Sequence, residues 1–460
     1  MVLQHSKPSD LALQIYEKLC HSRAATLVPP IEVLNNLFEC LFYSSMCKEE
    51  SDLVKVTVTF IDPSIVDPVD KSKKPERWSA IPFHQKLELS IKSLTKISKA
   101  ADPLSTYLAV FFEPDGRLYI WGLIDQALHN QNFLNYESES GSEQPGLFQV
   151  SINDIGTLNV LFDYELIATL KQNILVKRYL DVFTIGPISK MMRRNADELK
   201  ENVRFFLSNE NPDQSFREWE SFLDGLWIQT FSRLLLKIQN YNHGGAILIA
   251  DQFKDIDIKY RIDYNRLSDA MSAYAKESIR NYLLENNIDA ILNSGKRTID
   301  KKLYLMEANS LSAKKGISNE IKGSINFIAS QSCVDGVVLF GRNMSAKGFG
   351  AVLRSKKMPR RIYVSSAATA SQKSLIETDP RHFGTRHRSM IAYCWNHPES
   401  LGFVISQDGD IRAFTRIEDR LIMWENIKTQ QYIKQILVKQ KASETDFNTA
   451  AIRPGHIQHD

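Results

Sequence analysis

The spacing of apolar residues divides the first part of the chain into short strands and helices. Residues 54–61 (VKVTVTFI) alternate with a period of two and are rich in β-branched side chains, which is typical of a half-buried strand. Residues 107–112 and 117–124 predict a hairpin, because the Glu-Pro-Asp-Gly turn between them suits a chain reversal. Further apolar spacing predicts helices at 9–24, 31–46 and 84–99, a strand at 145–155, and a strand and a helix within 158–176.

Longer stretches with apolar residues at helical spacing dominate the second part of the chain. Residues 191–240 are predicted to be helical, and the run at 219–238 is amphipathic with one face toward a core. A basic, loop-like stretch is expected at 355–382, with a short strand inside it at 361–364. The pattern also predicts strands at 243–250, 335–340, 348–353, 401–406 and 411–414, and helices at 265–286, 318–331, 386–396 and 418–440.

Strands that alternate with helices indicate an α/β protein. We expect a mixed β-sheet flanked by helices, preceded by an N-terminal α+β domain. The predicted organisation is an N-terminal domain at 1–190, a helical connector at 191–240, a nucleotide-binding domain at 241–425, and a C-terminal helix with a polar tail at 426–460.

Composition adds limits on location and partners. Hydrophobic residues make up 43% and charged residues 24%, as in ordinary soluble globular proteins, and the net charge of +3 does not indicate a dedicated nucleic-acid surface. No apolar run approaches the roughly 20 residues of a membrane span, and the first ten residues are polar, so a cytoplasmic protein is expected. The five cysteines have no C-x-x-C spacing, which favours reduced, mostly buried thiols over a zinc site.

Asp335 and Gly336 stand at the head of an apolar strand (DGVVLF). A carboxylate there can hold a divalent ion or a ribose hydroxyl, and a glycine lets a ligand pack close to the backbone. The alternative is that Asp335 is a turn residue before a strand.

The segment GTRHRSM places Thr385 as the expected N-cap of a helix whose first turn carries Arg386, His387 and Arg388. Free backbone N–H groups and guanidinium groups would converge there, and arginine suits bidentate contacts to phosphate. Cations at a helix N-terminus are unfavourable without an anion, so the arrangement itself implies one. A solvated basic turn that pairs with local carboxylates is the alternative.

Gly244 and Gly245 follow His243 and enter an apolar strand (HGGAILI). Two glycines could form a backbone cradle for a base or a phosphate. A tight turn into a strand explains the same residues.

These motifs, in this order, resemble the DisA-type diadenylate cyclase (DAC) superfamily, in which a DGA and a GTRHRAA motif line the ATP site. The resemblance covers roughly 240–420 and includes the hairpin VISQDGDI, which contributes Ser406. With DGRLYIWGLID and NYESESGSEQPGLFQ in the first part, the chain resembles most closely the DACNV branch, proposed to be nucleotide sensors. The resemblance implies a bacterial signalling protein whose ligand lies between Asp335 and Arg386.

The resemblance also sets two functional hypotheses against each other. In cyclases a Ser-Glu-Glu run supports the metal, whereas this chain has Ser406 followed by Gln407 and Asp408, and the neutral Gln407 cannot replace a carboxylate ligand. The favoured hypothesis is a sensor that binds a nucleotide or cyclic dinucleotide without a cofactor and acts on a separate effector protein. The alternative is an active cyclase that condenses two ATP molecules, with Asp335 catalytic and holding Mg²⁺ or Mn²⁺ in a homodimer or higher oligomer.

Overall fold

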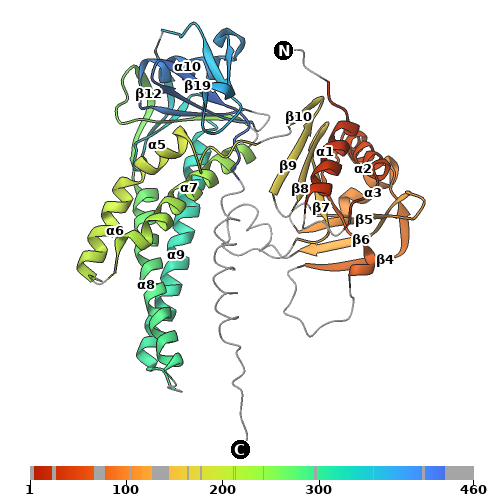
Figure 1. Cartoon of the computed structure of the whole chain (residues 1–460), viewed down its shortest axis with the longest axis horizontal. Coiled ribbons are helices and arrows are strands. Elements are labelled where there is room, and N and C mark those ends of the chain that lie inside the picture. The colour runs from red at the N-terminus through yellow and green to blue at the C-terminus, as the bar shows by residue number, and fades with distance from the viewer. Residues whose placement is uncertain are drawn as a thin grey trace, which may run out of the picture. The chain divides into compact units, whose positions relative to one another are not determined.

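The computed structural model describes residues 5–22, 27–66, 78–102, 105–126, 144–162, 165–176, 179–210, 212, 214–241, 243–294, 298–355, 357–406 and 410–429. These residues fall into two compact units, of which the first ends at Tyr179 and the second begins at Leu180. Both units combine helices with a β-sheet (Figure 1). The expectation of an α/β fold with mixed sheets is therefore confirmed.

The first unit is built on an eight-stranded sheet in the order β10-β9-β8-β7-β3-β5-β6-β4. Only the β3–β5 pairing is parallel, and the other neighbours are antiparallel. A separate two-stranded ribbon, β1 (Lys48–Glu49) with β2 (Asp52–Leu53), precedes it. The strands of the sheet are β3 (Val56–Phe60), β4 (Trp78–Glu88), β5 (Thr106–Phe112), β6 (Leu118–Gln126), β7 (Phe148–Asp154), β8 (Thr157–Phe162), β9 (Glu165–Lys171) and β10 (Ile174–Val176).

Helices α1 (Pro8–His21), α2 (Ile31–Ser44) and α3 (Ile91–Ile97) contribute to the main core of this unit. Leu34, Leu37, Phe38 and Leu41 recur at helical spacing on α2 and are fully buried, so they form the apolar stripe that the sequence predicts. They share a core cluster with strand residues such as Val58.

Three predicted helices of the chain are partly wrong. Residues 84–88 belong to strand β4, and only the shorter α3 follows. The described part of 158–176 contains strands β8, β9 and β10, with a turn between β9 and β10, and no helix. The predicted helix at 418–440 is replaced by strand β19 (Arg420–Trp424), and residues 430–440 lie outside the described residues. On β19, buried apolar side chains pack on both faces, which removes the period-two signal. Residues 84–88 are exposed, and their strand is set by pairing with β6 rather than by an apolar pattern.

The second unit contains a nine-stranded mixed sheet in the order β12-β14-β13-β11-β17-β18-β19-β15-β16. β11 lies near its centre and pairs parallel with β13 and antiparallel with β17. The strands are β11 (Gly245–Ile249), β12 (Ile256–Tyr264), β13 (Val337–Phe340), β14 (Ala346–Leu353), β15 (Ile362–Ser365), β16 (Leu375–Thr378), β17 (Leu401–Ile405), β18 (Ile411–Ile417) and β19.

Helices cover both faces of the central strands of this sheet. On β11, Ala246 and Leu248 belong to the core cluster that contains Met390 of α10 (Thr385–Asn396), whereas Ile247 and Ile249 belong to the cluster of the other helices. These other helices are α5 (Pro187–Asn195), α6 (Asp197–Glu210), α7 (Phe216–Asn240), α8 (Arg266–Asn293) and α9 (Lys301–Gln331). A strand buried on both faces is uniformly apolar, as the GAILI sequence is.

The cysteines are free, as predicted, but the prediction that most are buried is wrong. Cys20 is exposed, Cys40, Cys47 and Cys333 are partly exposed, and only Cys394 is buried. Burial raises the pKa of the Cys394 thiol to about 12, so this thiol stays protonated and acts as a packing residue of α10.

Candidate anion site at the start of helix α10

Helix α10 begins at Thr385, and Gly384 rather than Thr385 occupies the N-cap position. Gly384 has φ −64° and ψ 165°, and among the described residues no side chain caps the first turn. The helix is fixed on the sheet by buried Met390 and Cys394, which pack over Gly402 of β17 where a Cβ atom would collide with both. The N–H groups of the first turn are therefore held in place without a side-chain cap.

Arg386 and Arg388 lie in this first turn without a carboxylate partner. Arg386 is partly exposed and Arg388 is exposed, and neither guanidinium has a hydrogen bond or ion pair with any residue that the structure describes. The first turn contains no acidic residue. Two unpaired cations at the positive end of a helix favour a bound anion.

Two other arginines of this unit, Arg381 and Arg412, do have carboxylate partners. The Arg381 guanidinium pairs with the Asp379 carboxylate at 2.6 Å, and Arg412 pairs with Glu425 at 2.9 Å. Carboxylates are therefore available in the same unit, yet Arg386 and Arg388 have no such partner among the described residues.

His387 is not a free cation. Arg412 Nη1 lies 2.9 Å from His387 Nε2, and because arginine can only donate, Nε2 accepts and the imidazole proton is on Nδ1. Burial, followed by the charges of Arg412 and Arg386, lowers the pKa of His387 to about 4. At neutral pH the ring is uncharged and has one N–H left to donate to a ligand.

Arg412 and Glu425 were missed by the sequence reasoning. Arg412 lies on β18 and donates to Glu425 while it also donates to His387, so it orients the ring. The available signal was an arginine two residues before buried Phe414, on a strand whose alternation places both on the face toward α10.

The strand ends bring several predicted residues to one edge of the sheet. Gly245 pairs with Ile405, so Gly244 and Ser406 occupy the next position of the same ladder. The parallel register of Ile247 with Val338 carries Asp335 to the same edge. Arg412 pairs with Val404 near this edge, so the contact between His387 and Arg412 places the start of α10 there as well.

Asp335 is exposed and has no hydrogen bond or ion pair within the described part of the chain. No such bond joins it to Arg386 or Arg388 among these residues. The structure thus gathers the predicted residues at one sheet edge and leaves the carboxylate and the two guanidinium groups unneutralised.

The glycines have packing roles that the sequence did not reveal. A Cβ atom on Gly336, which has φ +129°, would lie 2.5 Å from the backbone carbon of Gly350. A Cβ atom on Gly245 would lie 2.8 Å from Ile238. The space next to both glycines is filled by protein, so close backbone packing is sufficient reason for them.

Ser406 closes the hairpin between β17 and β18. Its N–H donates to the Asp410 carbonyl at 2.9 Å, and its Oγ accepts from the Asp410 N–H at 3.1 Å. Gln407 and Asp408 lie outside the described residues.

Among the described residues at this sheet edge, the unpartnered carboxylate of Asp335 could bind a divalent cation. Mg²⁺ commonly binds one or two carboxylates together with substrate phosphates. Among the described residues no group of three His, Cys, Asp or Glu side chains forms a ready-made metal site. Asp335 therefore fits a metal that arrives with a nucleotide.

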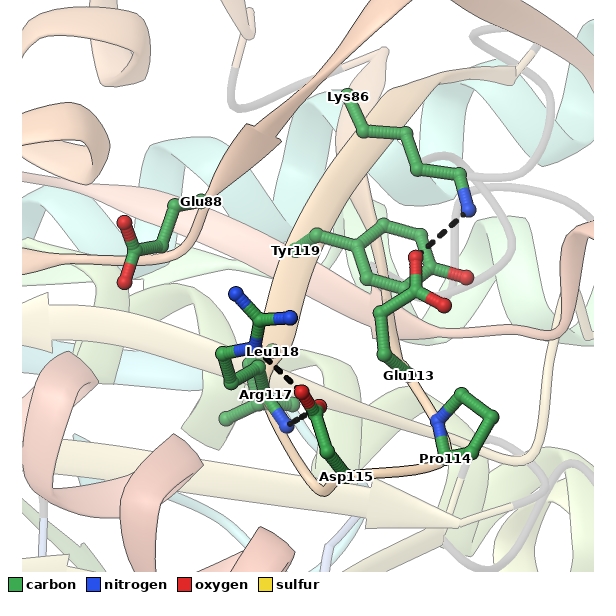
Figure 2. Close-up of a pocket in the computed structure, with 8 residues that line it drawn as sticks. All are labelled: Lys86, Glu88, Glu113, Pro114, Asp115, Arg117, Leu118 and Tyr119. Carbon is green, nitrogen blue, oxygen red and sulfur yellow. Dashed lines mark hydrogen bonds and ion pairs between the residues drawn. The ribbon is translucent and has the colours of Figure 1, made fainter.

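The first unit has a surface pocket of about 430 Å³ next to the β5–β6 turn (Figure 2). Lys86 Nζ lies 3.0 Å from Glu113 Oε1 and 4.1 Å from the centre of the Tyr119 ring, and Arg117 Nε lies 2.6 Å from Asp115 Oδ2. Figure 2 shows Glu88 apart from both pairs. The cations of this pocket already have anionic partners, so a ligand would have to displace an ion pair.

A probable sensor domain, DACNV, matches residues 23–125 of the 460. The match lies in the first unit and contains every residue that lines the pocket, whereas the resemblance to the cyclases rests on motifs in the second unit. No curated protein matches the chain.

None of the helices among the described residues has the length and apolar character needed to cross a membrane.

Proposed function

We propose that the chain is a sensor protein whose second unit binds a nucleotide or cyclic dinucleotide through the start of α10. The observation that carries the proposal is the pair of unpartnered guanidinium groups, Arg386 and Arg388, on an uncapped helix N-terminus. Phosphate oxygens would accept hydrogen bonds from both guanidinium groups and from the first-turn N–H groups.

The rest of the sheet edge supplies the polar groups that a nucleotide needs. His387 donates through Nδ1, and Asp335 accepts from a ribose hydroxyl or holds a divalent cation brought with the phosphates. Gly244 and Ser406 border the ligand on the side of β11. The first unit, with its match to a probable sensor domain, transmits or receives the signal, and a separate effector protein reads it.

Diadenylate cyclase activity is the second candidate. The exposed, unpartnered carboxylate of Asp335 at the same sheet edge favours it. When bound, Mg²⁺ or Mn²⁺ would neutralise developing charge on the phosphates, and Arg386 and Arg388 would hold the triphosphate.

The binding proposal is tested by calorimetry and thermal shift of the full chain with ATP, GTP, cyclic di-AMP and cyclic di-GMP. One of them should bind, and Arg386→Gln or Arg388→Gln should weaken it by roughly 10- to 100-fold, since a hydrogen bond to a charged group contributes about 1.5–3 kcal/mol. Arg381→Gln is the matched control, because this arginine is exposed, lies nearby and already pairs with Asp379. Equal losses in all three variants, or binding by none of the nucleotides, would contradict the proposal.

The second candidate is tested by incubation with ATP and Mn²⁺ followed by chromatography. Cyclic di-AMP formed by the wild type but not by Asp335→Ala would establish a cyclase and overturn a sensing-only role. Binding without product supports the sensor.

A further inference from the structure

A long helical hairpin leaves the sheet of the second unit between β12 and β13. α8 has 28 residues and α9 has 31, so at a rise of 1.5 Å per residue each helix is roughly 42–46 Å long. Figure 1 shows the far end of this hairpin extending beyond the sheet and the other helices of its unit. Asn281 is the last buried residue of α8 and Ser310 the first of α9. The described residues between these two positions include no buried side chain.

Large apolar side chains are exposed to solvent on this distal part of the hairpin. The exposed fractions are near one half in each case: Leu292 48%, Tyr304 57%, Leu305 54% and Met306 49%. Tyr282, closer to the sheet, is 50% exposed but packs its ring edge-on against Trp219 at 5.3 Å. Single exposed apolar residues are ordinary, but four near the far end of a two-helix arm are a concentration of the kind that marks a contact surface.

Charges divide between the two helices. Residues 282–293 of α8 carry Glu285 and Asp289 and no basic residue, whereas residues 301–315 of α9 carry four lysines and one glutamate, Glu307. Within the described residues, none of these three carboxylates has an ion pair. Burial and the Glu307 charge raise the pKa of Glu285, and the Lys314 charge offsets this only in part.

We propose that residues 282–293 of α8 and 301–315 of α9 form the interface through which two copies of this chain associate. The hairpins lie antiparallel, so that the acidic face of α8 in one copy meets the basic face of α9 in the other, and the reverse contact repeats by two-fold symmetry. The exposed apolar side chains are buried in the four-helix contact, which two helices cannot provide alone. A second copy is the occupant because one hairpin carries both complementary charges, the acidic residues on α8 and the lysines on α9.

Sedimentation velocity of the full chain over a hundredfold range of concentration tests the proposal. The wild type should form dimers, and Leu305→Gln with Met306→Gln should raise the dimer dissociation constant at least about tenfold. Phe205→Gln on α6 is the matched control, since that side chain is also apolar, helical and 71% exposed but lies outside the hairpin. A monomeric wild type, or a dimer that both variants leave unchanged, would overturn the proposal.

Charge exchange gives an independent test. Glu285→Lys with Asp289→Lys makes both helices basic, and Lys301→Glu, Lys302→Glu and Lys315→Glu together make both acidic. Each variant alone should be monomeric, with an unchanged circular dichroism spectrum, and an equal mixture of the two should recover a dimer that salt weakens. Failure of the mixture to associate, while wild type dimerises, would place the dimer contact elsewhere.

Discussion

The first turn of α10 and the pocket of the first unit both gather charged side chains at the surface, but their charges differ in state. Arg386 and Arg388 have no partner within the described residues, whereas Lys86 and Arg117 pair with Glu113 and Asp115. Paired surface charges are close to neutral for stability and gain little from a new anion. Unpaired cations at a helix N-terminus cost stability until an anion arrives. The comparison therefore favours the second unit as the site of anion binding.

The largest expected change in stability is at Gly336, which follows Asp335 at the α10 site. A substitution there leaves all the charges of the site in place. Gly336→Ala should destabilise the second unit by roughly 3 kcal/mol or more, since the new Cβ meets the Gly350 backbone at a positive φ. Urea denaturation measures the loss. Gly384→Ala is the control, because its φ is ordinary and a Cβ added there would have no other atom within 4 Å, and it should cost less than about 1 kcal/mol. Equal costs would show that Gly336 is not a packing residue.

His387 should give the α10 site a pH dependence between pH 7 and pH 4. Its pKa is lowered from 6.5 to about 4 in the folded state, so the unfolded chain binds the proton more tightly. The contribution of His387 to the free energy of unfolding is therefore fully present above pH 6.5. It is lost as the pH falls toward 4, which lowers stability by roughly 2 kcal/mol.

The measurement is the unfolding free energy from pH 7 to pH 4 for the wild type and for His387→Gln, which keeps a neutral acceptor for Arg412. The variant should lose less stability than the wild type over this range. Parallel curves would mean that the ring is not held neutral by its surroundings.

The smallest expected effect is a change in stability of opposite sign in the two units when one cation is removed from each. Arg388→Gln should stabilise the second unit by about 0.5 kcal/mol without ligand, because a cation leaves the positive end of a helix. Lys86→Gln should slightly destabilise the first unit, because it removes the pair with Glu113 and the contact with Tyr119. Thermal unfolding of both variants in low salt tests this. Destabilisation by Arg388→Gln would indicate a local partner for this arginine.

The sequence by itself predicted the α/β class, the central strand at Gly245–Ile249 and the helix that carries Arg386. These depend on local patterns, such as a continuous apolar run or a polar turn before an apolar stripe, that hold wherever the segment packs. Strand β19 was mistaken for helix because Leu421 and Met423 pack in one core cluster and Ile422 and Trp424 in another, so both faces are apolar. The strands within 158–176 bury one apolar face, and their pairing with neighbouring strands decides their structure.

Tertiary structure alone decided the state of each charge and the use of each glycine. The sequence contains Arg386, Arg388, Arg412 and Glu425 without saying which pair, and only the registers of β11, β17 and β18 bring Arg412 to His387 and leave the other two arginines free. Likewise, the tight approach at Gly336 arises because β14 folds back on β13. Both outcomes depend on distances between residues far apart in the chain, which local periodicity does not encode.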